Sequence, residues 1–403
     1  MRQRGIVQII AVFAIIAVLV MLPACSGKEQ PKVKKIEKQE VKIGFLGAMT
    51  GGAASIGIPT TEAARLAEEQ INARNLIPGK KLKVVYEDDQ CDAKSSSSAV
   101  QKLITQDKVV AIAGSLCSGA TLADAPISEQ NKMLQLSYGS TNPSVKDAGE
   151  YIFRNVPSDA NQGVEAANLL KRLGAQKVAV TYINNDWGAG LKEVFATAAE
   201  GLGMDVVAEE TYEPSATDFR AQLTKVKAAN PDMIYMLAYP ADAGLVLKQM
   251  RELGITVQVV GADASKDDAV LATAGNAADG LIVTLPGVPK SPELTAFADA
   301  YKAKYNKEYS AYTPEAYDAV MIIAKACAAT DCTSTAMKDY LYSMGLYKGA
   351  SGTYEFDADG EVSKTYDYFE VEGGKFVPYD AEEYAEGADE GAGNETAEGE
   401  ETA

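Results

Sequence analysis

The sequence predicts an α/β protein with two lobes, each built on a doubly wound parallel sheet. From Val41 onward, short apolar runs alternate with longer segments of helical spacing, and this alternation occurs in two successive series. The apolar runs show no regular polar alternation, which is typical of parallel strands covered by helices on both faces. The patterned part ends near Tyr379 and is long enough for two domains.

The first series alternates strands and helices in order. We expect its strands at residues 41–49, 81–89, 109–115 and 133–139. Segments with helical spacing lie between them at residues 60–75, 93–106 and 120–130. Strands that alternate with helices in this way form a parallel sheet with crossover connections.

A second series begins near Tyr151. Its strands are predicted at residues 151–156, 177–183, 205–212, 232–239, 257–263 and 280–285. Helical patterns include residues 218–230, 242–254, 292–305 and 311–330, and late hairpin-like strands follow at 352–357 and 366–379. Two similar lobes in one chain predict a cleft between them, with functional residues at the carboxyl ends of strands.

The N-terminal residues have the pattern of an export signal. A basic start and the apolar run 6–21 precede Leu22-Pro23-Ala24-Cys25, and the run is too short to span a bilayer. The ending resembles a bacterial lipobox, which predicts a signal peptide over 1–24 and a lipid on Cys25. An ordinary signal peptide with an incidental cysteine is the alternative. Residues 25–40 are polar and Lys-rich, and we expect a flexible linker there.

The charge balance excludes some partners. Residues 380–403 are acidic, contain no Lys or Arg, and are predicted to be a disordered tail. The whole chain carries a net charge of −18, so it repels nucleic acid, and no nucleic-acid partner is expected.

The chain contains no histidine. This absence removes the commonest general base, the histidine-activated nucleophiles and most zinc sites, so we expect neither an enzyme nor a metal site. The Gly-rich segment 47–57 lacks both the dinucleotide fingerprint and the Lys-Ser/Thr of a phosphate loop, so no cofactor is expected either.

Four cysteines remain if Cys25 carries lipid. An even number in an exported protein predicts disulfides, and four cysteines allow three pairings. Cys91 ends the second predicted strand and Cys117 follows the third, and adjacent parallel strands could bring the two within disulfide reach. Cys327 and Cys332 lie at a helix end and the following turn, which favours a local disulfide.

Seven segments, taken together and in order, carry a resemblance to a known family. They are VKIGFLGAMTG (41–51), YEDDQCDAK (86–94), GSLCSGAT (114–121), STNP (140–143), FRNVPSDANQG (153–163), NNDWGAGL (184–191) and AYTPEAYDA (311–319). The chain resembles the leucine/isoleucine/valine-binding proteins, the type I solute receptors of ABC importers, from about Val41 to Tyr379.

The resemblance implies two lobes joined by a hinge of three crossings near Ser158, Pro286 and Val362. Lobe 1 would comprise residues 41–158 and 287–361, and lobe 2 residues 159–286 and 362–379. The family has a disulfide at the positions of Cys91 and Cys117. Such a bridge makes Cys117 structural.

The implied carboxylate-binding residues lie in lobe 1. The disulfide would hold the turn that presents Ser118 and Gly119 at a helix N-terminus, where backbone N–H groups favour anions. Ser118 and Thr141 match the residues that hold an amino acid's α-carboxylate, and Gly139 matches one whose carbonyl accepts from the α-amine. The alternative from the residues alone is that Ser118 and Thr141 only cap helices.

The implied amine-binding residues lie in lobe 2. Asp263 and Tyr239 match the family's acid–tyrosine pair, but the acid is one methylene shorter than the usual glutamate. The ligand's amine must therefore sit deeper, or a water must bridge. A solvated turn residue is the alternative for Asp263.

The implied side-chain pocket consists of Trp187, Tyr312, Ile56 and Leu116. Such a lining favours an aliphatic or aromatic ligand side chain, because burying an unpaired charge is costly. Trp187 follows a strand and is expected in a loop; ordinary core packing is its alternative.

The resemblance implies a lipid-anchored, monomeric substrate-binding protein of an ABC importer, exported to the periplasm or cell exterior. It would capture a branched-chain or other hydrophobic amino acid by hinge closure and deliver it to an ABC permease. The alternative is a receptor or sensor of the same fold for amides, γ-amino acids or other small carboxylates.

Overall fold

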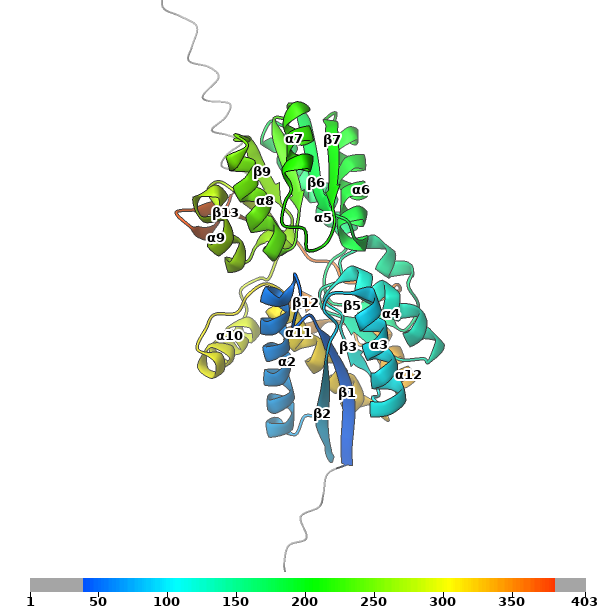
Figure 1. Ribbon diagram of the computed structural model, residues 1–403. Coiled ribbons are helices and arrows are strands. Elements are labelled where there is room, and N and C mark those ends of the chain that lie inside the picture. The colour runs from blue at the N-terminus through cyan, green and yellow to red at the C-terminus, as the bar shows by residue number, and fades with distance from the viewer. Residues whose placement is uncertain (1–38, 381–403) are drawn as a thin grey trace, which may run out of the picture. The chain divides into compact units, whose positions relative to one another are not determined.

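The computed structural model describes residues 39–380, which form two parallel-dominated sheets with helices packed against them (Figure 1). The predicted signal peptide, the predicted lipid attachment at Cys25, all but the end of the linker, and the tail from residue 381 lie outside the described residues. None of the helices within 39–380 has the length and apolar composition that crossing a bilayer requires.

The first sheet has five parallel strands in the order β2-β1-β3-β4-β5. Its strands are β1 (Gln39–Gly47), β2 (Lys80–Asp88), β3 (Ile112–Ala113), β4 (Gln135–Ser137) and β5 (Ile152–Arg154). β1 is buried along most of its length and carries Ile43 and Phe45, both fully shielded from solvent. An apolar central strand of this kind is expected when helices cover both faces of a sheet.

Helices flank this sheet on both sides. They are α2 (Ala54–Arg74), α3 (Ala93–Lys102), α4 (Ser118–Gln130), α10 (Pro292–Tyr305), α11 (Thr313–Ala329) and α12 (Ser334–Ser343). Short π- and 3₁₀-helical segments follow at Leu103–Asp107 and Pro143–Asp147. Helices α2 and α3 lie on opposite sides of β1 (Figure 1), and α2 packs against α11 while α3 packs against α4. We call β1–β5 with these six helices the first-sheet region.

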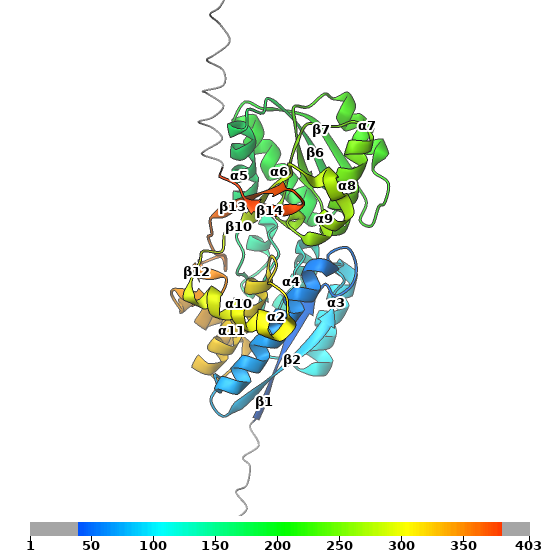
Figure 2. The same ribbon diagram turned by 90° about the vertical axis from the view of Figure 1, so that its left-hand side faces the viewer.

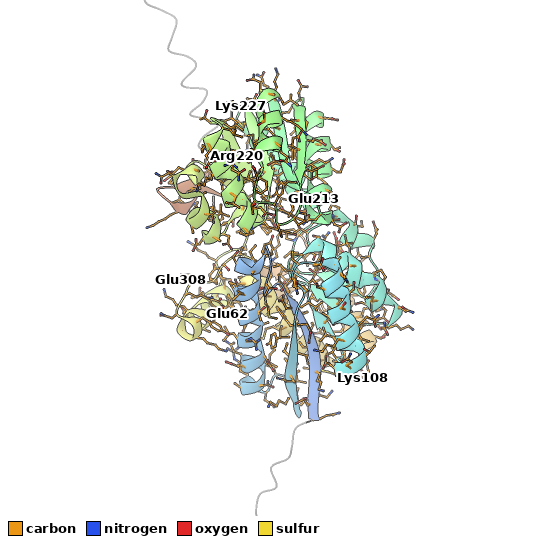
Figure 3. All side chains as sticks on the ribbon, in the orientation of Figure 1. Glu62, Lys108, Glu213, Arg220, Lys227 and Glu308 are labelled. Carbon is orange, nitrogen blue, oxygen red and sulfur yellow. A yellow bond between two sulfur atoms is a disulfide. The ribbon has the colours of Figure 1, made fainter. Side chains whose placement is uncertain are left out.

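Polar contacts join the outer helices of this region. The carboxylate of Glu62 on α2 accepts a hydrogen bond from the Tyr301 hydroxyl of α10 at 2.7 Å and pairs with Lys307 at 2.8 Å. Glu62 lies on the same side of the molecule as Glu308, which follows α10 (Figure 3). These contacts fix α10 against α2.

The second sheet has seven strands in the order β14-β13-β10-β9-β8-β6-β7. Its strands are β6 (Lys177–Ile183), β7 (Asp205–Tyr212), β8 (Met233–Leu237), β9 (Gln258–Gly261), β10 (Ile282–Pro286), β13 (Tyr366–Glu372) and β14 (Lys375–Pro378). β13 and β14 form an antiparallel hairpin that adds to β10 at the sheet edge (Figure 2). The other five strands are parallel.

Five helices accompany the second sheet. They are α5 (Asp159–Arg172), α6 (Asp186–Gly201), α7 (Arg220–Ala228), α8 (Pro240–Glu252) and α9 (Asp268–Ala274), with 3₁₀ turns at Asp263–Ser265 and Gly275–Ala278. We call β6–β10, β13 and β14 with these helices the second-sheet region.

The two sheets share one strand order in their parallel parts. β2-β1-β3-β4-β5 and β7-β6-β8-β9-β10 place the second strand of each series at one edge and the first strand next to it. After the first strand of each series, the chain adds its second strand on one side and all later strands on the other side, so the strand order reverses at β1 and at β6. Loops at the carboxyl ends of strands around such a reversal leave a crevice, which is where ligands bind in doubly wound sheets.

The observed elements differ from the expectations based on local pattern in two places. β5 begins the second series by pattern, but it pairs with β4 in the first sheet, because the chain crosses to the second sheet only after it. β12 (Gly352–Tyr354) pairs with β11 (Tyr347–Gly349) in a separate two-stranded ribbon. The hairpin expected at 366–379 is observed as β13 and β14, and it forms the edge of the second sheet.

Strand membership supports the proposed lobe boundaries. The chain leaves the first sheet after β5, returns after β10 and crosses again before β13. The exact limits at 158, 286 and 361 remain our proposal.

Candidate functional site

Residues from both regions line a small pocket at the carboxyl ends of the strands. Eight sequence-predicted site residues line it, namely Ile56, Leu116, Ser118, Gly139, Trp187, Tyr239, Asp263 and Tyr312. Ala53, Cys117 and Ala264 complete the lining; Cys117 was predicted only as a disulfide cysteine, and the two alanines carried no chemical signal in the sequence. Gly119 and Thr141, also predicted, do not line it. About 20 Å³ remains for the centres of water molecules, which is room for roughly one.

A disulfide holds the turn between β3 and α4. Cys91 and Cys117 are bonded, with 5.3 Å between their Cα atoms, and Cys117 is the residue just before α4. The expectation that they follow adjacent strands is wrong, because β1 lies between β2 and β3. The loops beyond the strand ends converge across the end of β1 and bring the two sulfurs together. Cys327 and Cys332 form the second disulfide, as predicted.

Ser118 and Thr141 have different surroundings. Ser118 begins α4, is 1 % exposed, and its Oγ accepts a hydrogen bond from the Asn142 backbone N–H at 3.2 Å. That leaves its own hydroxyl hydrogen for the pocket. The Thr141 hydroxyl instead donates to Asp159 Oδ2 at 2.9 Å. Of the two predicted hydroxyls, only Ser118 lines the pocket.

Gly139 allows Leu116 to reach the pocket. A Cβ at position 139 would lie 2.5 Å from Leu116 Cδ1 and 2.7 Å from its carbonyl oxygen. Any larger residue would therefore displace the turn before α4. The glycine brings the β4 loop against the β3 loop.

An aromatic stack forms the wall of the pocket in the second-sheet region. The rings of Trp187 and Tyr239 lie 5.1 Å apart at an interplanar angle of 10°. Trp187 was expected in a loop, but it lies in the first turn of α6, because the Asn185 side chain caps that helix through the Gly188 N–H. The Asn185 amide also donates to the Tyr239 hydroxyl at 3.2 Å, which orients the phenol.

Asp263 follows β9 and is 3 % exposed. Its carboxylate accepts hydrogen bonds from the Tyr312 hydroxyl and from Gln162 Nε2, the latter at 3.1 Å. Tyr312 has a φ of 62°, in the left-handed region that bulky residues avoid at a cost of about 1 kcal/mol or more. With this backbone conformation, the Tyr312 hydroxyl extends from the first-sheet region to Asp263 in the second-sheet region.

A second buried acid, Asp159, was not among the sequence-predicted site residues. It begins α5 and is fully buried; Oδ2 accepts from Thr141, and Oδ1 has no hydrogen-bond partner among residues 39–380. Burial and then the nearby charge of Asp263 raise the pKa of Asp159 well above its usual value. Burial also raises the pKa of Asp263. The sequence presented Asp159 as an ordinary first-turn acid after the Ser158 cap.

The cation beside this acid pair is already engaged. Arg154 is 1 % exposed and forms an ion pair with Glu361, and its guanidinium also donates to the carbonyls of Ser140 and Asn142. It lowers the pKa of Asp159 only as a minor influence against burial. Within residues 39–380, the two aspartates therefore form no ion pair with a positive side chain of their own.

The arrangement provides binding groups rather than catalytic ones. A hydroxyl at a helix N-terminus lies on one side, two buried acids lie on the other, and apolar and aromatic surface lies between them. Among residues 39–380, no group of three or more Asp, Glu or Cys side chains is placed to hold a metal ion.

Known proteins match this chain over most of its length. The family model described as periplasmic binding protein matches residues 40–375. A Pseudomonas aeruginosa amino acid binding protein is 30 % identical over 334 residues, covering 82 % of this chain and 89 % of that protein.

Two solved structures share the fold. A leucine binding protein from Thermotoga maritima has a TM-score of 0.80 and 28 % identity, with 84 % of this chain and 98 % of that one covered. A Streptococcus pneumoniae branched-chain amino acid transporter substrate-binding protein, in complex with isoleucine, has a TM-score of 0.78 and 31 % identity over 85 % of this chain and all of that one. The type I fold predicted from the sequence is confirmed.

The family model covers more than half of the chain, and the family consists of solute-binding proteins that catalyse no reaction, so the expectation of a non-enzyme is also confirmed. The chain belongs to the periplasmic binding protein family.

Proposed function

We propose that this protein is the extracytoplasmic substrate-binding component of an ABC importer and captures a branched-chain or other hydrophobic amino acid. The observation that carries the proposal is the pocket itself, whose lining combines Ser118 at the start of α4 with the aromatic stack and the buried acid Asp263. Similar proteins are named for leucine binding or were solved with isoleucine, which supports the same ligand class.

The polar groups suit the two charges of an amino acid. The α-carboxylate binds the Ser118 hydroxyl and the N-terminal N–H groups of α4, where the helix dipole favours an anion. The ammonium binds Asp263, with the Tyr239 hydroxyl and the Gly139 carbonyl as neutral acceptors. Burial and the nearby Asp263 raise the pKa of Asp159 well above its usual value, and an ammonium placed beside the two acids favours their ionised forms.

The apolar lining suits the ligand's side chain. Ile56, Leu116 and the Trp187 ring surround the space and offer no charged partner. Burying a leucine-sized side chain there contributes about 2–3 kcal/mol to binding.

Ligand entry requires the pocket to open. The pocket has space for about one water molecule, which is too little for an amino acid. The Tyr312 hydroxyl also donates a hydrogen bond to the Asp263 carboxylate, the group proposed to bind the ligand's ammonium. Entry therefore separates the Tyr312 hydroxyl from Asp263, and the ligand's ammonium replaces it. We propose that hinge movement between the two regions opens and closes the site, and that the ligand shifts the population toward closure.

The anchor and the partner complete the proposal. Lipidation of Cys25 ties the protein to the membrane, and residues 26–40 give it reach to an ABC permease. Mass spectrometry of the mature N-terminus tests this part, because an ordinary signal peptidase product would leave Cys25 without a diacylglycerol group.

Calorimetric titration with leucine tests the ligand assignment. The protein is stripped of ligand in mild denaturant with its disulfides intact. We expect one-to-one binding at micromolar or lower Kd, and a loss of about hundredfold in Asp263→Ala, because a buried ammonium then lacks its charged partner. Asp279→Ala, at an exposed acid of the same region, is the matched control and leaves the Kd unchanged.

One observation favours the alternative ligand class. The Asp263 carboxylate is already satisfied by Tyr312 and Gln162, so a ligand without an α-amine could bind without disturbing it. Amides, γ-amino acids and small carboxylates are therefore titrated in parallel. Retained affinity in Asp263→Ala for the tightest ligand would replace the α-amino acid proposal with this one.

A further inference from the structure

A second, much wider space adjoins the pocket. It measures about 550 Å³ by the same criterion that gives 20 Å³ for the pocket. Ala53, Cys117 and Tyr239 line both spaces, so the two meet beside the Cys91–Cys117 bridge. A ligand held in the pocket could extend past the disulfide into this outer space.

The lining of the outer space is acidic. Asp92, Asp186 and Asp242 contribute to it, and none of its lining residues is Lys or Arg. The first two are explained by local structure. The Asp92 carboxylate caps α3 through the Ser95 N–H, and the Asp186 carboxylate packs against α4, where a Cβ at Gly119 would lie 2.7 Å from Asp186 Oδ2.

Asp242 has no such explanation. It lies in the first turn of α8, is only 5 % exposed, and its carboxylate makes no hydrogen bond or ion pair within residues 39–380. Burial alone raises its pKa to about 6, so it is largely ionised at neutral pH. Asp242 lines the outer space, and its carboxylate oxygens are not fully shielded from solvent there. Partial burial still disfavours the charged form, and a cation in the outer space would give the carboxylate a partner that water and the dipole of α8 only partly replace.

We propose that the outer space is a subsite for a positively charged group at the far end of the ligand, with Asp242 as its main partner. The cleft then takes α-amino acids with an apolar stem and a terminal cation, of which lysine is the simplest, alongside uncharged hydrophobic ones. This inference rests on the proposed amino-acid function and extends its ligand class.

The geometry suits an organic cation. The stem of such a ligand passes between the apolar wall of the pocket and Tyr239, and its charged end reaches the three acids, which lie on three different helices or loops. These acids do not form a cluster of metal-ligand geometry among the described residues. The site therefore favours a group that carries its charge at the end of a chain.

Lysine and norleucine are the matched probes, because norleucine has the same four-carbon stem without the ammonium. Both are titrated calorimetrically into the full-length protein in detergent, for the wild type, Asp242→Asn and Asp268→Asn. Asp268 lies in the first turn of α9, is exposed, and does not line the cleft, so it is the control for charge and helix position.

We expect wild type to bind lysine at least as tightly as norleucine. Asp242→Asn should weaken lysine binding by about tenfold or more and change norleucine binding by less than about threefold, since a hydrogen bond to a charged group is lost only for lysine. Raising the salt concentration should weaken lysine binding more than norleucine binding. Asp268→Asn should change neither.

The outcomes separate this inference from the proposed function. Norleucine binding without lysine binding would overturn the cationic subsite and leave the amino-acid function intact. Equal losses of both ligands in Asp242→Asn would also overturn it, because Asp242 would then act on the pocket as a whole. If neither amino acid binds, both proposals fail.

Norleucine binding reports that each variant is folded. Asp186→Asn is a second variant, with a smaller expected loss of lysine binding.

Discussion

The two regions have the same parallel strand order but contribute different chemistry to the cleft. The first-sheet region presents small residues and a hydroxyl, with Ser118 at a helix start and Gly139 where a side chain would collide. The second-sheet region presents Trp187, Tyr239 and Asp263. The shared topology explains where both sets of residues lie, because both follow strands at the same kind of edge. The loop residues alone explain which groups each side presents.

The regions also differ in how they are held together. Both described disulfides lie in the first-sheet region, whereas the second-sheet region between residues 159 and 286 contains no cysteine. The predictions below test this division of stability and binding, from the largest expected effect to the smallest.

Removing the Cys91–Cys117 bridge should have the largest effect. The double variant Cys91→Ser/Cys117→Ser should lower the free energy of unfolding by about 3–4 kcal/mol, because the bridge closes 26 residues. Cys327→Ser/Cys332→Ser, which opens a separation of five, should cost about 2 kcal/mol.

Urea denaturation measures both variants. Circular dichroism follows both regions, and the fluorescence of Trp187, the only tryptophan, follows the second. If the circular dichroism and fluorescence transitions of Cys91→Ser/Cys117→Ser coincide, the two regions unfold as one unit. That result would contradict the prediction that the bridge stabilises the first-sheet region separately from the second.

Trp187→Ala should weaken leucine binding by about thirtyfold, or about 2 kcal/mol, because the stacked wall and its apolar area are lost. Trp187→Phe should retain most of the affinity. Calorimetry measures both, and tryptophan fluorescence of wild type should change on binding. An unchanged Kd in Trp187→Ala would assign this residue to the core.

The two hydroxyls of the first-sheet region should behave differently. Ser118→Ala should weaken leucine binding by about tenfold, since a donor to the carboxylate is lost. Thr141→Val should change affinity less and lower the free energy of unfolding by about 1–2 kcal/mol, because Asp159 loses its partner. Equal losses of affinity in the two variants would mean that Thr141 leaves Asp159 when ligand binds.

The smallest effect concerns pH. Burial raises the pKa of Asp124 to about 7, although hydrogen bonds donated by Ser96, Ser115 and Gln135 act in the opposite direction. Burial also raises the pKa of the neighbouring Asp89 to about 6. A raised pKa means that the folded protein holds a proton that the unfolded chain releases. Stability is therefore full below the unfolded value of 3.8 and falls as pH rises toward 7.

Asp124→Asn tests this expectation. Between pH 6 and 8, ionisation of Asp124 should lower the free energy of unfolding of the wild type by about 1 kcal/mol. The free energy of unfolding of Asp124→Asn should fall by correspondingly less over the same range. Urea denaturation at the two pH values measures the difference. Asp331→Asn, at an exposed acid whose pKa is lowered, is the control and should leave the slope between pH 6 and 8 unchanged. Equal slopes in wild type and Asp124→Asn would show that Asp124 is already ionised in the folded protein across this range.

Much of the fold followed from local pattern. Apolar runs such as 41–49 and helical spacing such as 60–75 depend on neighbours in the chain, and the structure has a strand and a helix there. The resemblance then identified eight residues that line the pocket. Local pattern could not place β1 between β2 and β3, nor assign β5 to the first sheet, because strand order depends on contacts between distant segments.

The sequence by itself determined the alternating α/β class and the absence of histidine, and it predicted an export signal and the residues that would bind an amino acid. The tertiary structure alone decided that Asp159 lies beside Asp263, that the Tyr312 hydroxyl reaches Asp263, and that Asp242 is only 5 % exposed with no side-chain partner in the described part of the chain. These residues lie far apart in the chain or look like ordinary helix-start acids. Their charges acquire significance only when folding removes the surrounding water and brings them together.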